Sequence, residues 1–192
     1  MMDAFLDLLP AVGLAIALAA CAGLRAWLPL LLAGGLARAG WLELGPQFQF
    51  LGSNKALLLF AVATLIEVTA DKVPAVDHAL DALSTLLRPA AGALLAASVL
   101  GRVADPLTAL ALGIAVGAPA ALVPHAAKSG LRAISTALSA GLANPVLSLL
   151  EDIATVALFV LALLVPVLVA ASVVLLALWI ARLRRPAPLE VR

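Results

Sequence analysis

The residues best suited to chemistry are carboxylates that close an apolar run over residues 56–70. Thr64, Glu67 and Asp71 are spaced i, i+3, i+7, so in a helix they share one face. A carboxylate one or two turns inside a membrane is costly without a partner, and clustered oxygens can bind a hard cation or relay protons. We expect this face to bind or relay an ion, with Lys72 as the counter-ion that fills the empty site. The alternative is an interfacial acid neutralised by a nearby cation.

A second acidic pair, Glu151 and Asp152, lies near the start of the apolar run 145–165. Ser148 and Thr155 flank the pair at helical spacing, so hydroxyls and carboxylates again share a face. If the helices that carry the two faces are antiparallel, both sets lie on the same side of the bilayer and can converge. The alternative is structural, because acids at a helix start also suit the helix dipole.

The four letters GLRA occur twice, at 23–26 and 130–133. Each copy follows an apolar run and precedes a short segment of small residues. Arg25 and Arg132 are therefore a duplicated pair that could hold an anion such as phosphate together with helix N-termini. The alternative is that each arginine snorkels to the membrane surface.

Residues 74–88 predict an amphipathic helix on the membrane surface. Asp77, Asp81 and Arg88 share its polar face and suit the two ends of its dipole, so we interpret them as structural charges. Pro89 is expected to end this helix.

Composition identifies an all-α integral membrane protein. Of 192 residues 65% are hydrophobic and only 12% are charged, with a mean hydropathy of +1.17. So short a chain cannot hide that much apolar surface from water. The net charge of +1 gives no reason to expect nucleic acid, and a single cysteine excludes an internal disulfide. No Ser/His/Asp set or phosphate loop appears, so we expect no enzyme activity and no cofactor; a metal stays undecided.

Hydrophobic run lengths predict about 6–7 spans in one membrane domain, residues 1–192. The matching order of elements around the GLRA copies indicates two inverted repeats, as in transporter folds. Whether the short segments 27–39, 89–100 and 131–143 span or re-enter is open. The predicted parts are a first repeat at 4–72, the amphipathic helix and connector at 73–104, a second repeat at 105–181 and a basic tail at 182–192.

Positive charge predicts the orientation. RLRR at 182–185 places the C-terminus in the cytoplasm, and Lys72, Arg88 and Arg102 place the amphipathic region there too. The N-terminus lacks the positive charge of a signal peptide. We expect a multi-pass protein of a bacterial inner membrane.

Nine residues between positions 67 and 92 carry a family resemblance: Glu67, Asp71, Lys72, Pro74, Asp77, Asp81, Arg88, Pro89 and Gly92. With them the chain resembles a bacterial membrane family catalogued as a domain of unknown function, DUF4126, which implies a small multi-span protein with no established activity. EVTADK is also similar to a signature of cation/proton exchangers with inverted repeats, although Val73 stands where those have a hydroxyl residue and the glycine is missing. The DUF4126 resemblance covers most of the chain.

Three functions fit these observations. The first is a transporter or carrier coupled to a cation or proton through Glu67 and Asp71. The second is a carrier of anionic lipid or phosphate that uses Arg25 and Arg132. The third is a structural or accessory membrane protein whose charges only anchor helix ends. The expected partners are the bilayer and a small ion or lipid substrate, and self-association into a homo-oligomer stays undecided.

Overall fold

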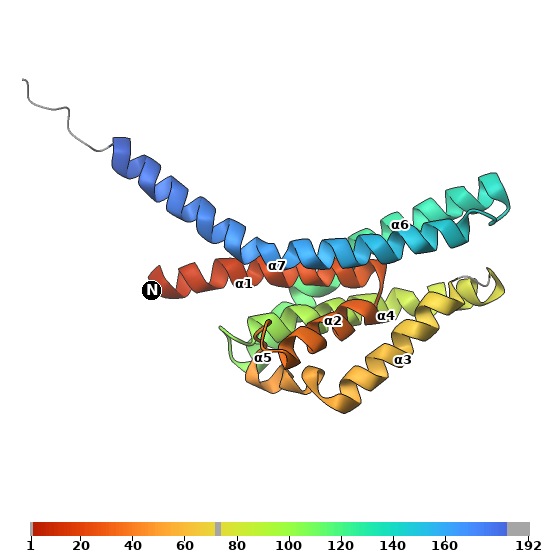
Figure 1. The fold of residues 1–192 in the computed structure, drawn as a ribbon, viewed down its shortest axis with the longest axis horizontal. Helices are drawn as coiled ribbons and strands as arrows, with labels where there is room; N and C mark the ends of the chain where they lie inside the picture. Colours follow the sequence, from red (N-terminus) through yellow and green to blue (C-terminus); the bar gives the residue numbers. More distant parts are fainter. Residues whose placement is uncertain (1, 72–73, 184–192) are drawn as a thin grey trace, which may run out of the picture.

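A computed structural model describes the backbone of residues 2–71 and 74–183, with side chains described mainly over 8–71 and 83–166. Its described part is all-helical and without strands, as predicted (Figure 1). The elements are α1 (Met2–Leu24), α2 (Trp27–Arg38), the 3-10 helix η1 (Pro46–Gly52), α3 (Asn54–Ala70), α4 (Pro74–Leu100), α5 (Pro106–Leu112), the π-helical turn η2 (Gly113–Gly117), α6 (Ala118–Ser139) and α7 (Asn144–Leu183).

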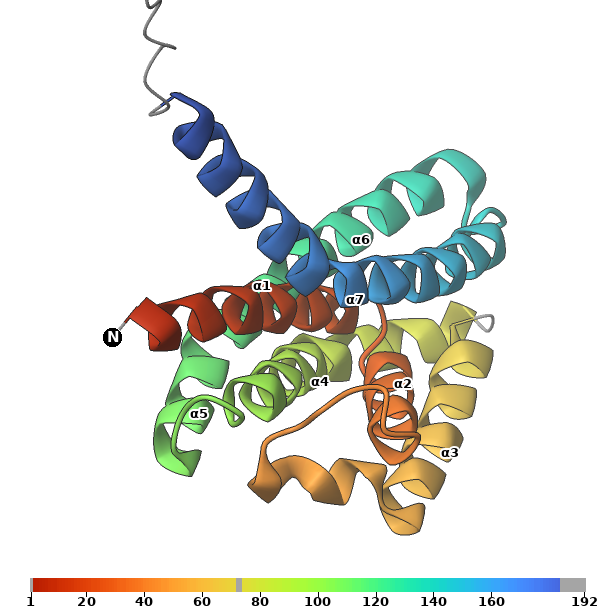
Figure 2. The ribbon, with the colours of Figure 1, turned by 60° about the vertical axis from the view of Figure 1, so that its left-hand side comes forward.

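Helix α1 lies at the centre of the bundle. It packs against α4, α6 and α7, and Figures 1 and 2 both show it between α7 and α4. The face of α1 that meets these helices is rich in small residues, among them the fully buried Ala15, Ala19 and Ala22. Small side chains let helix backbones approach closely where lipid offers no hydrophobic driving force.

Glycines bring α4 and η2 into backbone contact. A Cβ atom on Gly92 would lie 2.8 Å from the carbonyl oxygen of Gly117, and one on Gly117 would lie 2.5 Å from the carbonyl oxygen of Gly92. Neither position has space for a side chain. This contact holds α4 against the chain that leads into α6.

The amphipathic helix does not end at Pro89, contrary to the prediction. Helix α4 runs unbroken from Pro74 to Leu100 with Pro89 inside it, and residues 83–100 are long and apolar enough to cross a membrane. A proline in a helix removes one backbone hydrogen bond. Burial of Leu95, Val99 and other side chains after Pro89 offsets that loss, so the helix continues.

For Pro166 the sequence predicts either a break between two spans or a kink inside one helix. Helix α7 continues through Pro166 as one helix, and Figure 1 shows that it bends. The described residues contain three helical stretches able to span a membrane, Leu83–Leu100, Pro106–Ser139 and Asn144–Pro166. A fourth is possible if η1 and α3, which meet at 58°, form one broken span. The predicted 6–7 spans are therefore not confirmed.

The two GLRA copies have different surroundings. The first forms the break between α1 and α2, whereas the second lies inside the continuous helix α6. The prediction that residues 131–143 form a separate short segment is therefore wrong, and inverted repeats are not confirmed. In the first copy, the backbone N–H groups of Ala26 and Trp27 donate hydrogen bonds to Glu67 of α3, and these bonds stabilise the break.

The ends of α3 and α7 lie far apart. Figures 1 and 2 show the C-terminal end of α3 close to the α6–α7 turn, while the C-terminal end of α7 is at the opposite end of the bundle. The predicted location of both ends on the cytoplasmic side is therefore not confirmed. The difference follows from α7 being one helix rather than two antiparallel spans.

Candidate functional site

Three cations surround one carboxylate oxygen between α1, α3, α6 and α7. The Oδ2 atom of Asp71, at the end of α3, accepts hydrogen bonds from Nη1 of Arg25, from Nη2 of Arg132 at 3.0 Å and from Nζ of Lys128 at 3.4 Å. Arg25 is fully buried and Asp71 is 5% exposed. Buried charges persist only when they are paired, and Asp71 pairs with all three cations.

Glu151 binds two of the same cations from α7. It forms a two-pronged ion pair with Arg132, with Nε to Oε1 and Nη2 to Oε2 both at 3.1 Å. Its Oε2 atom is also 2.8 Å from Nζ of Lys128. Lys128 and Arg132 are thus held between Asp71 on one side and Glu151 on the other.

Arg25 is fixed by two further groups of α7. Its Nη2 donates to the Ser148 hydroxyl at 2.8 Å and to the Ser148 carbonyl at 3.2 Å. Its Nε lies 2.7 Å from Oδ1 of Asp152, but the N–H is not aligned for a hydrogen bond. We therefore treat the contact between Arg25 and Asp152 as charge attraction alone.

Glu67 closes the break between α1 and α2. Its carboxylate accepts the backbone N–H of Ala26 at 3.0 Å and that of Trp27 at 3.3 Å. The first amides of a helix have no partner within it, and an N-cap side chain normally supplies one. Here the cap comes from α3 instead, so Glu67 has a clear structural role, with Arg88 3.9 Å away.

Arg88 holds a histidine of α6. Its Nη1 is 2.7 Å from Nδ1 of His125, and Nε2 of His125 is 3.4 Å from the hydroxyl of Thr85. A guanidinium can only donate, so Nδ1 accepts and the ring proton sits on Nε2. The sequence suggested only a structural charge on a surface helix. Arg88 is instead almost fully buried and contacts His125.

One face of α6 supplies most of these partners. Its buried positions are Ala121, His125, Lys128 and Arg132, spaced i, i+4, i+7, i+11. Sequence reasoning missed His125 and Lys128. The signal was present, because basic residues at helical spacing in so apolar a chain share one face.

The cluster balances its charge. Among the residues whose side chains the structure describes, it contains four cations and four acids, so their formal charges sum to zero with His125 neutral. The cations are Arg25, Arg88, Lys128 and Arg132, and the acids are Glu67, Asp71, Glu151 and Asp152.

The structure thus brings together the two predicted acidic pairs and the duplicated arginines. Thr64 is not among them. Its hydroxyl is buried without a hydrogen-bond partner and lies beside a groove near Asp152. Lys72 and the side chains of Asp77 and Asp81 lie outside the described residues. Lys128 holds the counter-ion position predicted for Lys72.

Comparison with known families agrees with the resemblance seen in the sequence. A family model described as a domain of unknown function (DUF4126) matches residues 12–185. The chain belongs to this family. No curated protein and no solved structure matches it. Within the described part of this DUF4126 chain, no group of three His, Cys, Asp or Glu side chains could hold a metal ion.

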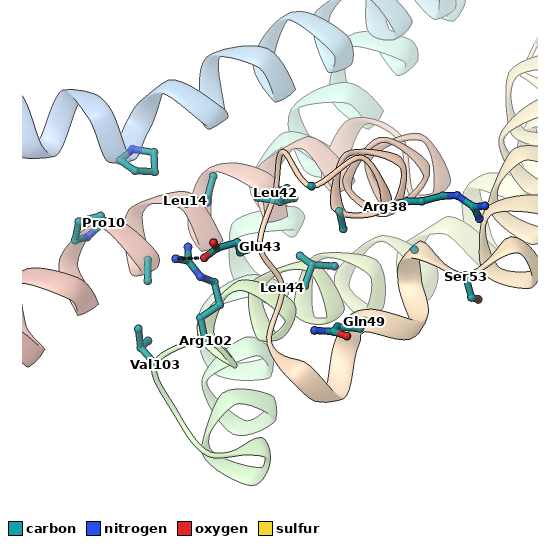
Figure 3. A pocket seen from close by; sticks show the side chains of 15 residues that line it. Pro10, Leu14, Arg38, Leu42, Glu43, Leu44, Gln49, Ser53, Arg102 and Val103 are labelled. Atoms are coloured by element: carbon teal, nitrogen blue, oxygen red, sulfur yellow. Dashed lines mark ion pairs between the residues drawn. The ribbon is translucent and has the colours of Figure 1, made fainter.

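A separate cavity of about 1010 Å³ opens at the other end of α1 (Figure 3). Its walls include Pro10 and Leu14 of α1, Arg38 at the end of α2, and Pro166 of α7. Figure 3 shows Glu43 and Arg102 facing each other in it, with Oε2 and Nη2 2.8 Å apart. These two side chains are 78% and 41% exposed, so this ion pair differs in kind from the buried cluster.

Proposed function

We propose that this DUF4126 protein is a small ion-coupled carrier in which Asp71 binds and releases a transported proton. The observation that carries the proposal is the convergence of three buried cations on one Asp71 oxygen. Ionisable groups inside a membrane bundle are costly, and proton relays are among their usual functions. Protonation of Asp71 would remove one ionic partner from three cations at once and so alter how α1, α3 and α6 attract one another.

A proton fits this site better than a metal cation. A metal would have to displace Arg25, Lys128 or Arg132 from carboxylates that already have ion-pair partners. A proton needs no such space. Glu67 is less suited to coupling because it caps α2. Glu151 and Asp152 keep the cations in place from α7.

The arrangement of the bundle supports a path between two sides of a membrane. The 1010 Å³ cavity lies at the end of α1 that carries Pro10, and the charge cluster lies at the end that carries Arg25. Buried residues of α1 between them, including Leu18 and Ala22, close the space in this conformation. A carrier needs such a closed region, which opens to one side at a time.

Positive charge orients the protein in this proposal. Arg38 and Arg102 line the cavity at the end of the bundle where α7 leads to the basic tail. The positive-inside rule places that end in the cytoplasm. The Asp71 cluster then lies toward the outer side of a bacterial inner membrane.

Purified protein in liposomes tests the proposal. Vesicles loaded with a pH-sensitive dye would be given gradients of Na⁺, K⁺, Mg²⁺ and phosphate in turn. We expect at least one gradient to move protons faster than in empty vesicles, and Asp71→Asn to abolish that movement. Asp105→Asn, which removes an exposed carboxylate outside both the cavity and the cluster, is the matched control and should behave as wild type. No proton movement with any gradient, or full movement in Asp71→Asn, would contradict the proposal.

The remaining alternative is an accessory protein whose cluster only joins helices. It predicts that Asp71→Asn lowers stability while wild-type vesicles show no ion movement at all. Equal amounts of protein per vesicle and a single size-exclusion peak for each variant separate that outcome from poor folding.

A further inference from the structure

We infer that Arg25, Lys128 and Arg132 form an oxyanion-binding site, which the protein's own Asp71 carboxylate occupies in this structure. A carboxylate, phosphate or sulfonate group of a substrate takes its place when Asp71 is protonated. The inference rests on the proposed function, because the same residue takes up the transported proton.

The three cations are held in position without Asp71. Arg25 keeps its hydrogen bonds to Ser148, and Lys128 and Arg132 keep their contacts with Glu151. Each cation has therefore a second partner on α7. A site whose donors are already fixed loses little conformational freedom when a ligand binds.

Donor geometry suits an oxyanion. The nitrogen atoms come from three places in the chain, the α1–α2 break and two turns of α6, and they meet at one oxygen. Two guanidinium groups and an ammonium group match the oxygens of carboxylates and phosphates. The expected ligand therefore carries an oxyanion group that resembles the carboxylate of Asp71.

Charge links the proton to the anion. Protonated Asp71 leaves four cations and three acids, a buried excess of one positive charge. Such an excess is costly in a membrane interior. A bound monoanion removes the excess, so each ligand strengthens the binding of the other. No covalent bond forms or breaks in the substrate; one proton joins the Asp71 carboxylate as one anion arrives.

A groove of about 530 Å³ reaches the cluster from the side. It runs between α3 and α7, and one of its lining residues is Asp152, which touches Arg25. Its other walls include Val68, Ile153 and Val156. An oxyanion on an apolar chain could enter this way, as a lipid headgroup would, while a small oxyanion could arrive from water. The chemistry at the cations is the same for both.

Sulfonates test the site because their charge does not change with pH. Wild-type protein in phosphatidylcholine nanodiscs would be titrated calorimetrically with methanesulfonate and with hexanesulfonate at pH 5 and pH 8. We expect wild type to bind about tenfold more tightly at pH 5, within the usual range of coupling between two ligands. Tighter binding of hexanesulfonate would indicate an amphiphilic substrate, and equal binding a small soluble one.

Two further measurements use the coupling itself. Wild type titrated at pH 7 in buffers of different ionisation enthalpy should take up a proton as sulfonate binds. Asp71→Asn should bind with the same affinity at both pH values. Asp105→Asn, which removes an exposed carboxylate outside both the cavity and the cluster, should keep the wild-type pH dependence. Absence of sulfonate binding, or binding without proton uptake in wild type, would overturn the inference.

The two proposals can fail separately. Proton movement that depends on Asp71, with no sulfonate binding, would leave the carrier without this anion site. Sulfonate binding with proton uptake, but no ion movement in vesicles, would leave an anion-binding protein that is not a carrier.

Discussion

Arg25 and Arg132 donate hydrogen bonds to the same oxygen atom of Asp71. They are the arginines of the two GLRA copies, yet one lies in a helix break and the other inside a continuous helix. Similarity in sequence has therefore not produced similar backbone structure. What the two copies share is the target of their side chains.

Loss of the Asp71 charge should weaken the fold. Asp71→Asn leaves three buried cations with one acid fewer, and breaking a buried ion pair in this way costs about 3–5 kcal/mol. Glu43→Gln breaks an exposed pair, which is worth about 0–1 kcal/mol. Thermal unfolding of both variants in the same detergent measures the difference. Equal losses would show that burial does not matter to these pairs.

The same variant offers a second measurement. If the cations stay in place, methanesulfonate should raise the unfolding temperature of Asp71→Asn, because a ligand that binds only the folded state stabilises it. Glu43→Gln should show a smaller rise at neutral pH. No rise in either protein would count against a retained anion site.

Glu67 should act as a helix cap. Glu67→Ala leaves the N–H groups of Ala26 and Trp27 without their acceptor, which costs about 1–3 kcal/mol for buried donors. Hydrogen exchange at the start of α2 should accelerate, and Glu67→Gln, which keeps one oxygen, should lie between Ala and wild type. Thr64→Val, one turn earlier on α3, is the control. If Glu67→Ala leaves exchange at α2 unchanged, the cap is not needed.

The glycines of the two GLRA copies should respond differently to alanine. A Cβ atom on Gly23 would lie 2.1 Å from the carbonyl oxygen of Ala121, so α1 and α6 would have to separate. A Cβ atom on Gly130 meets nothing within 4 Å. We expect Gly23→Ala to destabilise the protein and Gly130→Ala to be neutral or to stabilise it by up to about 1 kcal/mol. The opposite order in thermal unfolding would refute the close packing of α1 on α6.

Asp105 should make stability depend on acid at the start of α5. Its pKa is lowered by hydrogen bonds from the Thr108 side chain and from the backbone N–H groups of Thr108 and Leu107, which favour the charged form. Because the folded-state pKa is the lower one, this stabilisation is present above the ordinary carboxyl pKa. It is lost as pH falls through the lowered value. Asp105→Asn should reduce the acid dependence of unfolding, and an unchanged pH profile would exclude the effect.

The sequence was informative where charge is rare. The pairs at 67–71 and 151–152 stood out because the apolar runs around them contain so few charges, and the structure joins them through Arg25. The helical class followed from composition in the same way. These inferences need only the cost of placing charge in lipid.

The ends of the helices and the residues they bury depend on contacts between helices, and the periodicity of the sequence does not predict those contacts. The continuation of α4 past Pro89 depends on burial of the residues that follow it. The break at Arg25 depends on a carboxylate that arrives from α3. Lys128 and His125 were identifiable only by reading α6 as one helix, whereas the prediction began a new short segment at residue 131.

The equal numbers of positive and negative groups in the cluster have an electrical consequence. Moving one elementary charge through a membrane potential changes its energy by about 2.3 kcal/mol per 100 mV. If the cluster's cations and acids move together, no net charge crosses the membrane potential, so the potential does not change the energy of that movement. A proton that travels with a monoanion adds none either, so the transport step would run at the same rate in polarised and depolarised membranes.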